Sequence, residues 1–218
     1  MTALRRTLIV LAALAAVAVA GLAAWELTPS PRQADSGGAT GTAEIGGPFT
    51  LVNTEGETVT ADDFRGRYML VYFGFTFCPD VCPTSLMDMT RALDRLAETA
   101  PGKAERVVPV FITVDPARDT VAVMDSYVEN FHPRLVGLTG SAQQVAEAAA
   151  EYRVYYEKVA AEQYRGGQAA AAGDSGADYL MDHSSYIYLM GPDGRYLTNF
   201  KYGASPQEIA AGLRQHVE

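Results

Sequence analysis

Residues 74–83 read Gly-Phe-Thr-Phe-Cys-Pro-Asp-Val-Cys-Pro and contain both cysteines of the chain, Cys78 and Cys82. The segment ends an apolar run, Tyr68–Phe75, that is rich in β-branched and aromatic residues and is typical of a buried strand. Pro83 suits the first position of a helix, where no backbone N–H is needed. We therefore predict that a buried strand delivers two thiols to a turn at the start of a helix.

A helix start favours reactive thiols. Its first N–H groups are unpaired and carry partial positive charge, and both effects lower the pKa of a nearby cysteine. If the step from Cys78 to Cys82 is helical, their Cα atoms lie about 6 Å apart on one face. This separation allows the pair to chelate one soft metal ion or to close a disulfide.

Inert interpretations of the cysteines stay open at this point. The pair can form a structural disulfide or act as two small buried hydrophobic residues. A disulfide across so short a loop constrains the unfolded chain little, which favours a reactive pair over a structural one. The spacing C-x-x-x-C is one residue longer than the common redox motif and favours a chelate.

The composition indicates a folded, acidic protein. The chain has 218 residues, of which 48% are hydrophobic and 20% charged, and its formal net charge is -9. These values suit one domain with a full core. An acidic domain without a basic patch argues against nucleic-acid binding.

The N-terminal sequence predicts a membrane anchor and a tether. Residues 7–25 are uninterruptedly apolar and follow Arg5 and Arg6; as a helix they extend about 28 Å, enough to cross a bilayer. The positive-inside rule then places the following domain outside the cytoplasm, and a cleaved signal peptide is the alternative. The expected division is an anchor or signal sequence at 1–27, a flexible linker at 28–47 and a folded domain at 48–218.

Strand and helix patterns alternate along that domain. Expected strands are 49–52 and 58–59 as a hairpin, then 68–75, 107–114, 135–138, 154–159, 184–190 and 196–200. Helices are expected after the cysteines, after Asp119 as N-cap, and after capping boxes at Ser141 and Ser205. Residues 160–177, rich in Ala and Gly, read as a long loop. This order predicts a thioredoxin-like three-layer α/β/α domain with an N-terminal hairpin, preceded by one transmembrane helix.

If the two cysteines bind a metal, the candidates for a third ligand are the three histidines of the chain. His132 and His216 are explained by helix ends and solvation. His183 stands in Asp-His-Ser-Ser on a predicted loop, where ligands are often placed, although a lone histidine is more often structural. Asp182 and Asp115 are placed to orient an imidazole or tune a metal.

Several motifs together carry a family resemblance. They are residues 74–83, Val114-Asp-Pro-Ala-Arg-Asp-Thr120, Phe131-His-Pro-Arg134, Gly137-Leu-Thr-Gly140 and Asp182-His-Ser184. In this order, over roughly residues 47–216, the sequence resembles the SCO/SenC family of copper chaperones. The resemblance implies that Cys78, Cys82 and His183 bind copper, with the acidic residues Asp80, Asp115 and Asp182 near the site.

The resemblance also implies a function. By this resemblance, the protein would be a copper chaperone anchored in the bacterial inner membrane, with its domain on the periplasmic side. It would deliver copper to the binuclear centre of cytochrome c oxidase. Its partners would be the copper-accepting subunit of that enzyme and other periplasmic copper carriers. Two thiolates and an imidazole suit both Cu(I) and Cu(II), and a three-coordinate, exposed site would let partner thiols take the ion.

Other functions use the same residues. A thiol–disulfide reductase would use Cys78 and Cys82 as its redox pair to keep client cysteines reduced for metallation. A thiol peroxidase would use Cys78 to attack peroxide. Both alternatives predict that activity survives replacement of His183. Zinc also suits a Cys/His set but is less favoured at an open, exchangeable site.

Overall fold

The computed structural model describes residues 45–160 and 179–218. The predicted anchor, nearly all of the predicted linker and nearly all of the Ala/Gly-rich segment lie outside these residues. Within the described ranges, no helix is both long enough and apolar enough to cross a membrane.

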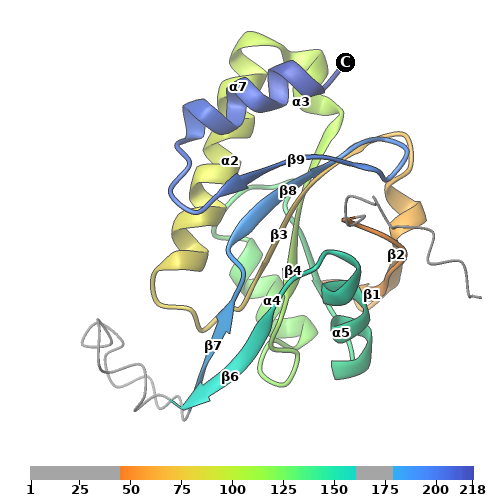
Figure 1. The fold of residues 1–218 in the computed structure, drawn as a ribbon, viewed down its shortest axis with the longest axis vertical. Coiled ribbons are helices and arrows are strands. Elements are labelled where there is room, and N and C mark those ends of the chain that lie inside the picture. The colour runs from red at the N-terminus through yellow and green to blue at the C-terminus, as the bar shows by residue number, and fades with distance from the viewer. Residues whose placement is uncertain (1–44, 161–178) are drawn as a thin grey trace, which may run out of the picture. The chain divides into compact units, whose positions relative to one another are not determined.

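A seven-stranded sheet with the order β2-β1-β5-β4-β3-β8-β9 forms the centre of the domain (Figure 1). Its three central strands β3, β4 and β5 are parallel, and β8 runs antiparallel to β3. The strands are β1 (Thr50–Asn53), β2 (Thr58–Thr60), β3 (Tyr68–Gly74), β4 (Val107–Thr113), β5 (Val136–Thr139), β8 (Tyr186–Met190) and β9 (Tyr196–Lys201).

Helices cover both faces of this sheet. They are the short 3-10 helix η1 (Ala61–Phe64) and the α-helices α2 (Val81–Thr99), α3 (Pro101–Glu105), α4 (Val121–Val128), α5 (Ala142–Glu151) and α7 (Pro206–His216). Tyr72 of β3 stacks with Phe111 on the face covered by α2, whereas its neighbour Phe73 packs on Tyr152, just after α5. The predicted α/β architecture, with its N-terminal hairpin and terminal hairpin plus helix, is therefore confirmed.

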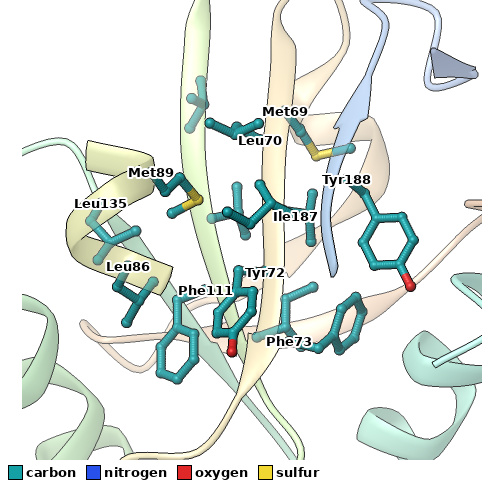
Figure 2. Packing of buried hydrophobic residues seen from close by; sticks show 14 of the residues in the cluster. Met69, Leu70, Tyr72, Phe73, Leu86, Met89, Phe111, Leu135, Ile187 and Tyr188 are labelled. Carbon is teal, nitrogen blue, oxygen red and sulfur yellow. The ribbon is translucent and has the colours of Figure 1, made fainter. Parts of the chain in front are cut away.

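The core lies along the two central strands. Every residue of β3 and of β4 is buried, because parallel strands covered on both faces have no solvent side. Figure 2 shows Leu86 and Met89 of α2 on one side of β3, and Phe73 and Tyr188 on the other. This packing fixes the end of β3, from which the cysteine turn leaves the sheet.

Two predicted helix starts are wrong in detail. Helix α2 begins at Val81, so that Pro83 is its third residue rather than its first; the third N–H of a helix also needs no partner, which is why proline fits there. The N-cap of α4 is Thr120, whose side chain accepts a hydrogen bond from the Val123 N–H, and not Asp119. The capping boxes at Ser141 and Ser205 are confirmed.

A separate two-stranded ribbon was only half predicted. It consists of β6 (Tyr156–Ala160) and β7 (Tyr179–His183), which pair antiparallel. The sequence predicts β6 but not β7. As a result His183, expected on a loop, lies on the last residue of a strand and pairs with Tyr156. This pairing gives the histidine a fixed backbone position.

Candidate metal centre

The two cysteines lie on either side of a helix start. Cys78 is half-buried in the turn that follows β3, and Cys82 is the buried second residue of α2. Both are free thiols, and the Cys82 N–H donates a hydrogen bond to the Cys78 sulfur over 3.3 Å. The predicted interaction between a helical N–H and a thiol is therefore present, although Cys78 itself is not helical.

The turn that carries Cys78 is tied to the sheet by a buried carboxylate. Asp119 is fully buried and accepts hydrogen bonds from the Thr76 N–H at 3.0 Å and the Thr76 hydroxyl at 2.6 Å. It also accepts one from the Thr113 hydroxyl at 2.6 Å, at the end of β4. Thr76 is two residues from Cys78, so that Asp119 fixes the path of the backbone into the cysteine turn.

Gly74 allows the buried sulfur to approach the end of β3. A Cβ atom at this position would lie 2.9 Å from the Cys82 sulfur and 3.0 Å from both Tyr72 Cε1 and Phe111 Cε2. Any larger residue would displace these groups, because such distances are shorter than real Cβ contacts. The glycine thus leaves the space in which the Cys82 side chain lies.

The environments of the two thiols drive their pKa values apart. Hydrogen bonding with the Cys82 side chain is the main cause that lowers the pKa of Cys78 to about 4. The His183 side chain and the Cys82 N–H also lower this pKa, whereas burial raises it. Burial, followed by the interaction with Cys78, raises the pKa of Cys82 well above its ordinary value. Cys78 is therefore a thiolate at neutral pH, and Cys82 is its buried, protonated partner.

His183 reaches the cysteines from a distant part of the chain. Its Nε2 atom lies 3.5 Å from the Cys82 sulfur, and its Nδ1 atom lies 3.1 Å from the Ser184 carbonyl oxygen. A carbonyl oxygen only accepts, so Nδ1 donates this hydrogen bond, and Nε2 faces the sulfur of Cys82. The rings of Tyr72 and Phe75 pack edge-on against the imidazole, with centroids 6.2 and 5.9 Å away, and fix its orientation.

The donor atoms suit a soft metal ion. Metal–sulfur and metal–nitrogen bonds of about 2.3 and 2.0 Å place their two donors about 3.5 Å apart at an ordinary coordination angle. The distance between Cys82 Sγ and His183 Nε2 has this value. As they stand, no three or more Cys, His, Asp or Glu side chains of residues 45–160 and 179–218 are grouped closely enough to enclose an ion.

The three predicted acidic residues occupy different surroundings. Asp80 is exposed at the N-cap of α2, where its side chain caps nothing. Asp182 is exposed on β7 and paired in register with Glu157; adjacent strand residues point to opposite faces, so that it does not support the imidazole of His183. Asp115 is buried and accepts a hydrogen bond from the Tyr179 hydroxyl at 2.9 Å.

Arg118 is a residue of the site's surroundings that the sequence reasoning missed. It forms an ion pair with Asp115, and its guanidinium lies 3.8 Å from the ring centroid of Tyr179 and 4.8 Å from that of Phe77. Since Phe77 precedes Cys78, the arginine links β7, which carries His183, to the cysteine turn. Its place within the motif 114–120 is the one signal in the sequence that could have identified it, and nothing in the sequence indicates its aromatic partners.

The other two histidines are not brought to the cysteines. His132 lies 3.6 Å from Asp94, and its Nδ1 accepts a hydrogen bond from the Arg134 N–H. His216 lies in the last turn of α7. His132 was expected near a helix end and His216 as a solvated residue of the last helix, and His216 does lie on that helix, where it is half-buried.

Comparisons with known proteins find related sequences. The chain is 44% identical over 171 residues to the mitochondrial SCO2 homolog of Bos taurus, covering 78% of this chain and 59% of the relative. It is 40% identical over 171 residues to an SCO2-like protein of Rickettsia felis, covering 78% of this chain and 76% of the relative. The chain thus spans about three fifths of the length of the mammalian SCO2 proteins that it matches.

A solved structure shows the same fold. Arabidopsis thaliana ScoI, determined with copper bound, superposes with a TM-score of 0.67 at 39% sequence identity, covering 79% of this chain and 99% of that chain. The family model SCO1/SenC matches residues 37–218, which include the cysteine turn, the buried aspartates and His183. The sequence, the fold and the site therefore lead to one assignment: the chain belongs to the SCO1/SenC family.

Proposed function

We propose that this protein binds one copper ion as cargo through Cys78, Cys82 and His183, and passes it to the copper-accepting subunit of cytochrome c oxidase. The observation that carries the proposal is the 3.5 Å approach of His183 Nε2 to the sulfur of Cys82, beside the free thiol of Cys78. A family that includes copper-bound members supports copper as the ion.

The donor set suits both oxidation states of copper. Two thiolates favour Cu(I), and an imidazole nitrogen also allows Cu(II) to bind. Cys78 supplies a preformed thiolate, whereas Cys82 must lose its proton when the ion binds. The Nδ1 atom of His183 is held by the Ser184 carbonyl, which leaves Nε2 directed at the sulfur of Cys82.

Release to a partner would begin at Cys78. This sulfur is the more exposed of the two and lies in the turn beside the exposed side chain of Phe77, while Cys82 is buried. A partner thiolate that binds the ion can replace Cys78 first and the inner donors afterwards, so that copper is never released into water. The number of metal–ligand bonds stays constant through each exchange.

The location of the protein is part of the proposal. Residues 1–27 would anchor the chain in the inner membrane of a bacterium, residues 28–47 would tether it, and residues 48–218 would work on the periplasmic side. The apolar stretch 7–25 behind two arginines supports this arrangement. Other periplasmic copper carriers would then supply the ion.

A reductase is the second candidate, and the contrast between the two thiols favours it. The Cys78 thiolate would attack a client disulfide to form a mixed disulfide, and Cys82 would then displace the client's second thiolate. The client gains two electrons, and this protein is left with a Cys78–Cys82 disulfide that an external thiol must reduce. This reaction uses neither the lone pair of His183 nor a metal.

Copper titration of the full-length reduced protein separates the two candidates. The proposal expects one copper per chain, a thiolate-to-copper band in the Cu(II) form, and transfer of Cu(I) to the isolated copper domain of the oxidase subunit. Replacing a residue that only supports a metal ligand typically weakens metal binding about 10- to 100-fold. His183→Ala should weaken copper binding by more than this, and His132→Ala should not weaken it. Disulfide exchange that is unchanged in His183→Ala, together with no copper binding by the wild type, would replace the proposal with the reductase.

A further inference from the structure

Tyr72 has a buried hydroxyl without a hydrogen-bond partner. It lies on β3 and is fully buried. Among the buried side-chain polar atoms of residues 45–160 and 179–218, three lack a partner: Tyr72 Oη, Arg118 Nη2 and Tyr127 Oη. Leaving such a group unpaired is unfavourable for folding, so a tyrosine at a core position where phenylalanine would fit needs an explanation.

The Tyr72 ring lies against two of the proposed copper ligands. A Cβ atom added to Gly74 would lie 3.0 Å from the Tyr72 Cε1 atom and 2.9 Å from the Cys82 sulfur. The edge of the Tyr72 ring and the sulfur therefore lie around the same small space beside Gly74. Its ring also packs edge-on against the imidazole of His183, at 72° and 6.2 Å between centroids. Of the three residues with unpaired groups, Tyr72 is the one that contacts both ligands.

A copper-bound sulfur at Cys82 would offer the Tyr72 hydroxyl the partner that it lacks. A protonated thiol is a weak acceptor, whereas a thiolate accepts strongly from an O–H donor. Cys82 is fully buried, and its sulfur and the edge of the Tyr72 ring meet beside Gly74. When copper binds, Cys82 becomes a thiolate in a buried place, where a negative sulfur requires a donor.

We propose that Tyr72 is a positioning residue of the copper site, which donates a hydrogen bond to Cys82 Sγ when that sulfur is a copper-bound thiolate. The inference rests on the proposed function, since it requires copper at this site. The atoms needed are in place: the O–H rotates freely about its bond to the ring, and the rigid, fully buried strand β3 holds the ring.

Such a bond would tune the copper rather than hold the fold. A hydrogen bond to a ligand sulfur withdraws electron density from it, and hydrogen bonding around a cysteine sulfur is a known determinant of copper reduction potential. Removing the hydroxyl leaves a more electron-rich sulfur. The charge-transfer band of the Cu(II) form should then move to longer wavelength, and the reduction potential should fall.

The test compares Tyr72→Phe with Tyr152→Phe in the full-length protein. Tyr152 is also a buried tyrosine, but it packs on Phe73 at the opposite face of the sheet. Tyr72→Phe should bind one copper, unfold at the same or a higher urea concentration than wild type when metal-free, and show the shifted band and lower potential. Tyr152→Phe should keep the wild-type band and potential.

A second measurement compares the two proteins in ordinary and in deuterated water. The copper–sulfur stretching vibration of the Cu(II) form should shift in deuterated water, and the shift should be smaller in Tyr72→Phe, in which only the hydrogen bond from the Cys82 N–H to the Cys78 sulfur remains. One copper per chain with the same band, potential and deuterium shift in Tyr72→Phe and wild type would overturn the role of Tyr72 and leave the proposed function intact. Wild-type protein that binds no copper would overturn both.

Discussion

The Nε2 atom of His183 lies 3.5 Å from the sulfur of Cys82, although the two residues are 101 positions apart in the chain. Two separate features create this contact. Cys82, in the first turn of α2, lies against the buried end of β3. Pairing of β7 with β6 fixes the backbone of His183. The half-buried Cys78 completes the donor set, in which Cys82 is the fully buried member.

The first prediction concerns the reactivity of the two thiols. In the reduced, metal-free protein, alkylation of Cys78 by iodoacetamide should stay near its maximal rate down to about pH 5 and fall with a midpoint near the pKa of about 4. Cys82 should remain unmodified, because it is buried and protonated. Mass spectrometry of the labelled peptides measures both rates.

Cys82→Ala provides the control for this experiment. Hydrogen bonding with Cys82 is the largest influence that lowers the pKa of Cys78, so the midpoint in this variant should rise toward the ordinary value of about 8.5. A midpoint near 8 in the wild type would show that the two sulfurs do not interact in solution.

The same pKa difference makes stability depend on pH. The pKa of Cys78 is lower in the folded than in the unfolded chain, so its contribution is present above the unfolded value and is lost as the pH falls toward about 4. Between about pH 5 and about pH 8, the unfolding free energy should rise with pH more steeply in the wild type than in Cys78→Ser. Urea titrations of the reduced, metal-free proteins test this, and equal slopes would contradict it.

A third prediction addresses the carboxylate behind the cysteine turn. Asp119→Asn should lower the unfolding free energy by about 2–3 kcal/mol, because it weakens hydrogen bonds from Thr76 and Thr113 to a buried charged group. The exposed Asp125 on α4 provides a matched control, and Asp125→Asn should change stability by less than about 0.5 kcal/mol. Equal stability of the two variants would show that the buried carboxylate does not support the turn.

A fourth prediction addresses the space beside Cys82. Gly74→Ala should cost about 1–3 kcal/mol of stability and weaken copper binding, since the added methyl would lie 2.9 Å from the Cys82 sulfur. Gly102→Ala on α3 meets no atom within 4 Å and should be neutral or slightly stabilising in a helix. Wild-type stability and copper affinity in Gly74→Ala would mean that the sulfur is not held against β3.

Local patterns made much of this fold predictable. The apolar runs of β3 and β4 and the capping boxes at Ser141 and Ser205 are encoded within a few neighbouring residues. The position of both cysteines at a strand–helix junction follows from the same kind of pattern. These elements were found because their signals do not depend on distant parts of the chain.

Non-local contacts explain what the sequence did not show. Strand β7 is short and exists by pairing with β6, so that the site of His183 reads as a loop in the sequence alone. Asp119 and Thr120 both suit an N-cap, and only the burial of Asp119 against Thr76 and Thr113 distinguishes them. The unpaired hydroxyl of Tyr72 has no sequence signal, because a tyrosine in a buried strand reads simply as core.

X-ray absorption at the copper edge of the Cu(I)-loaded, full-length protein identifies the atoms that bind the ion. We expect one copper per chain with two sulfur ligands and one imidazole nitrogen, and loss of the nitrogen in His183→Ala while His132→Ala stays like the wild type. Copper bound by two sulfurs alone in the wild type, with a spectrum unchanged in His183→Ala, would contradict this expectation and remove His183 from the site.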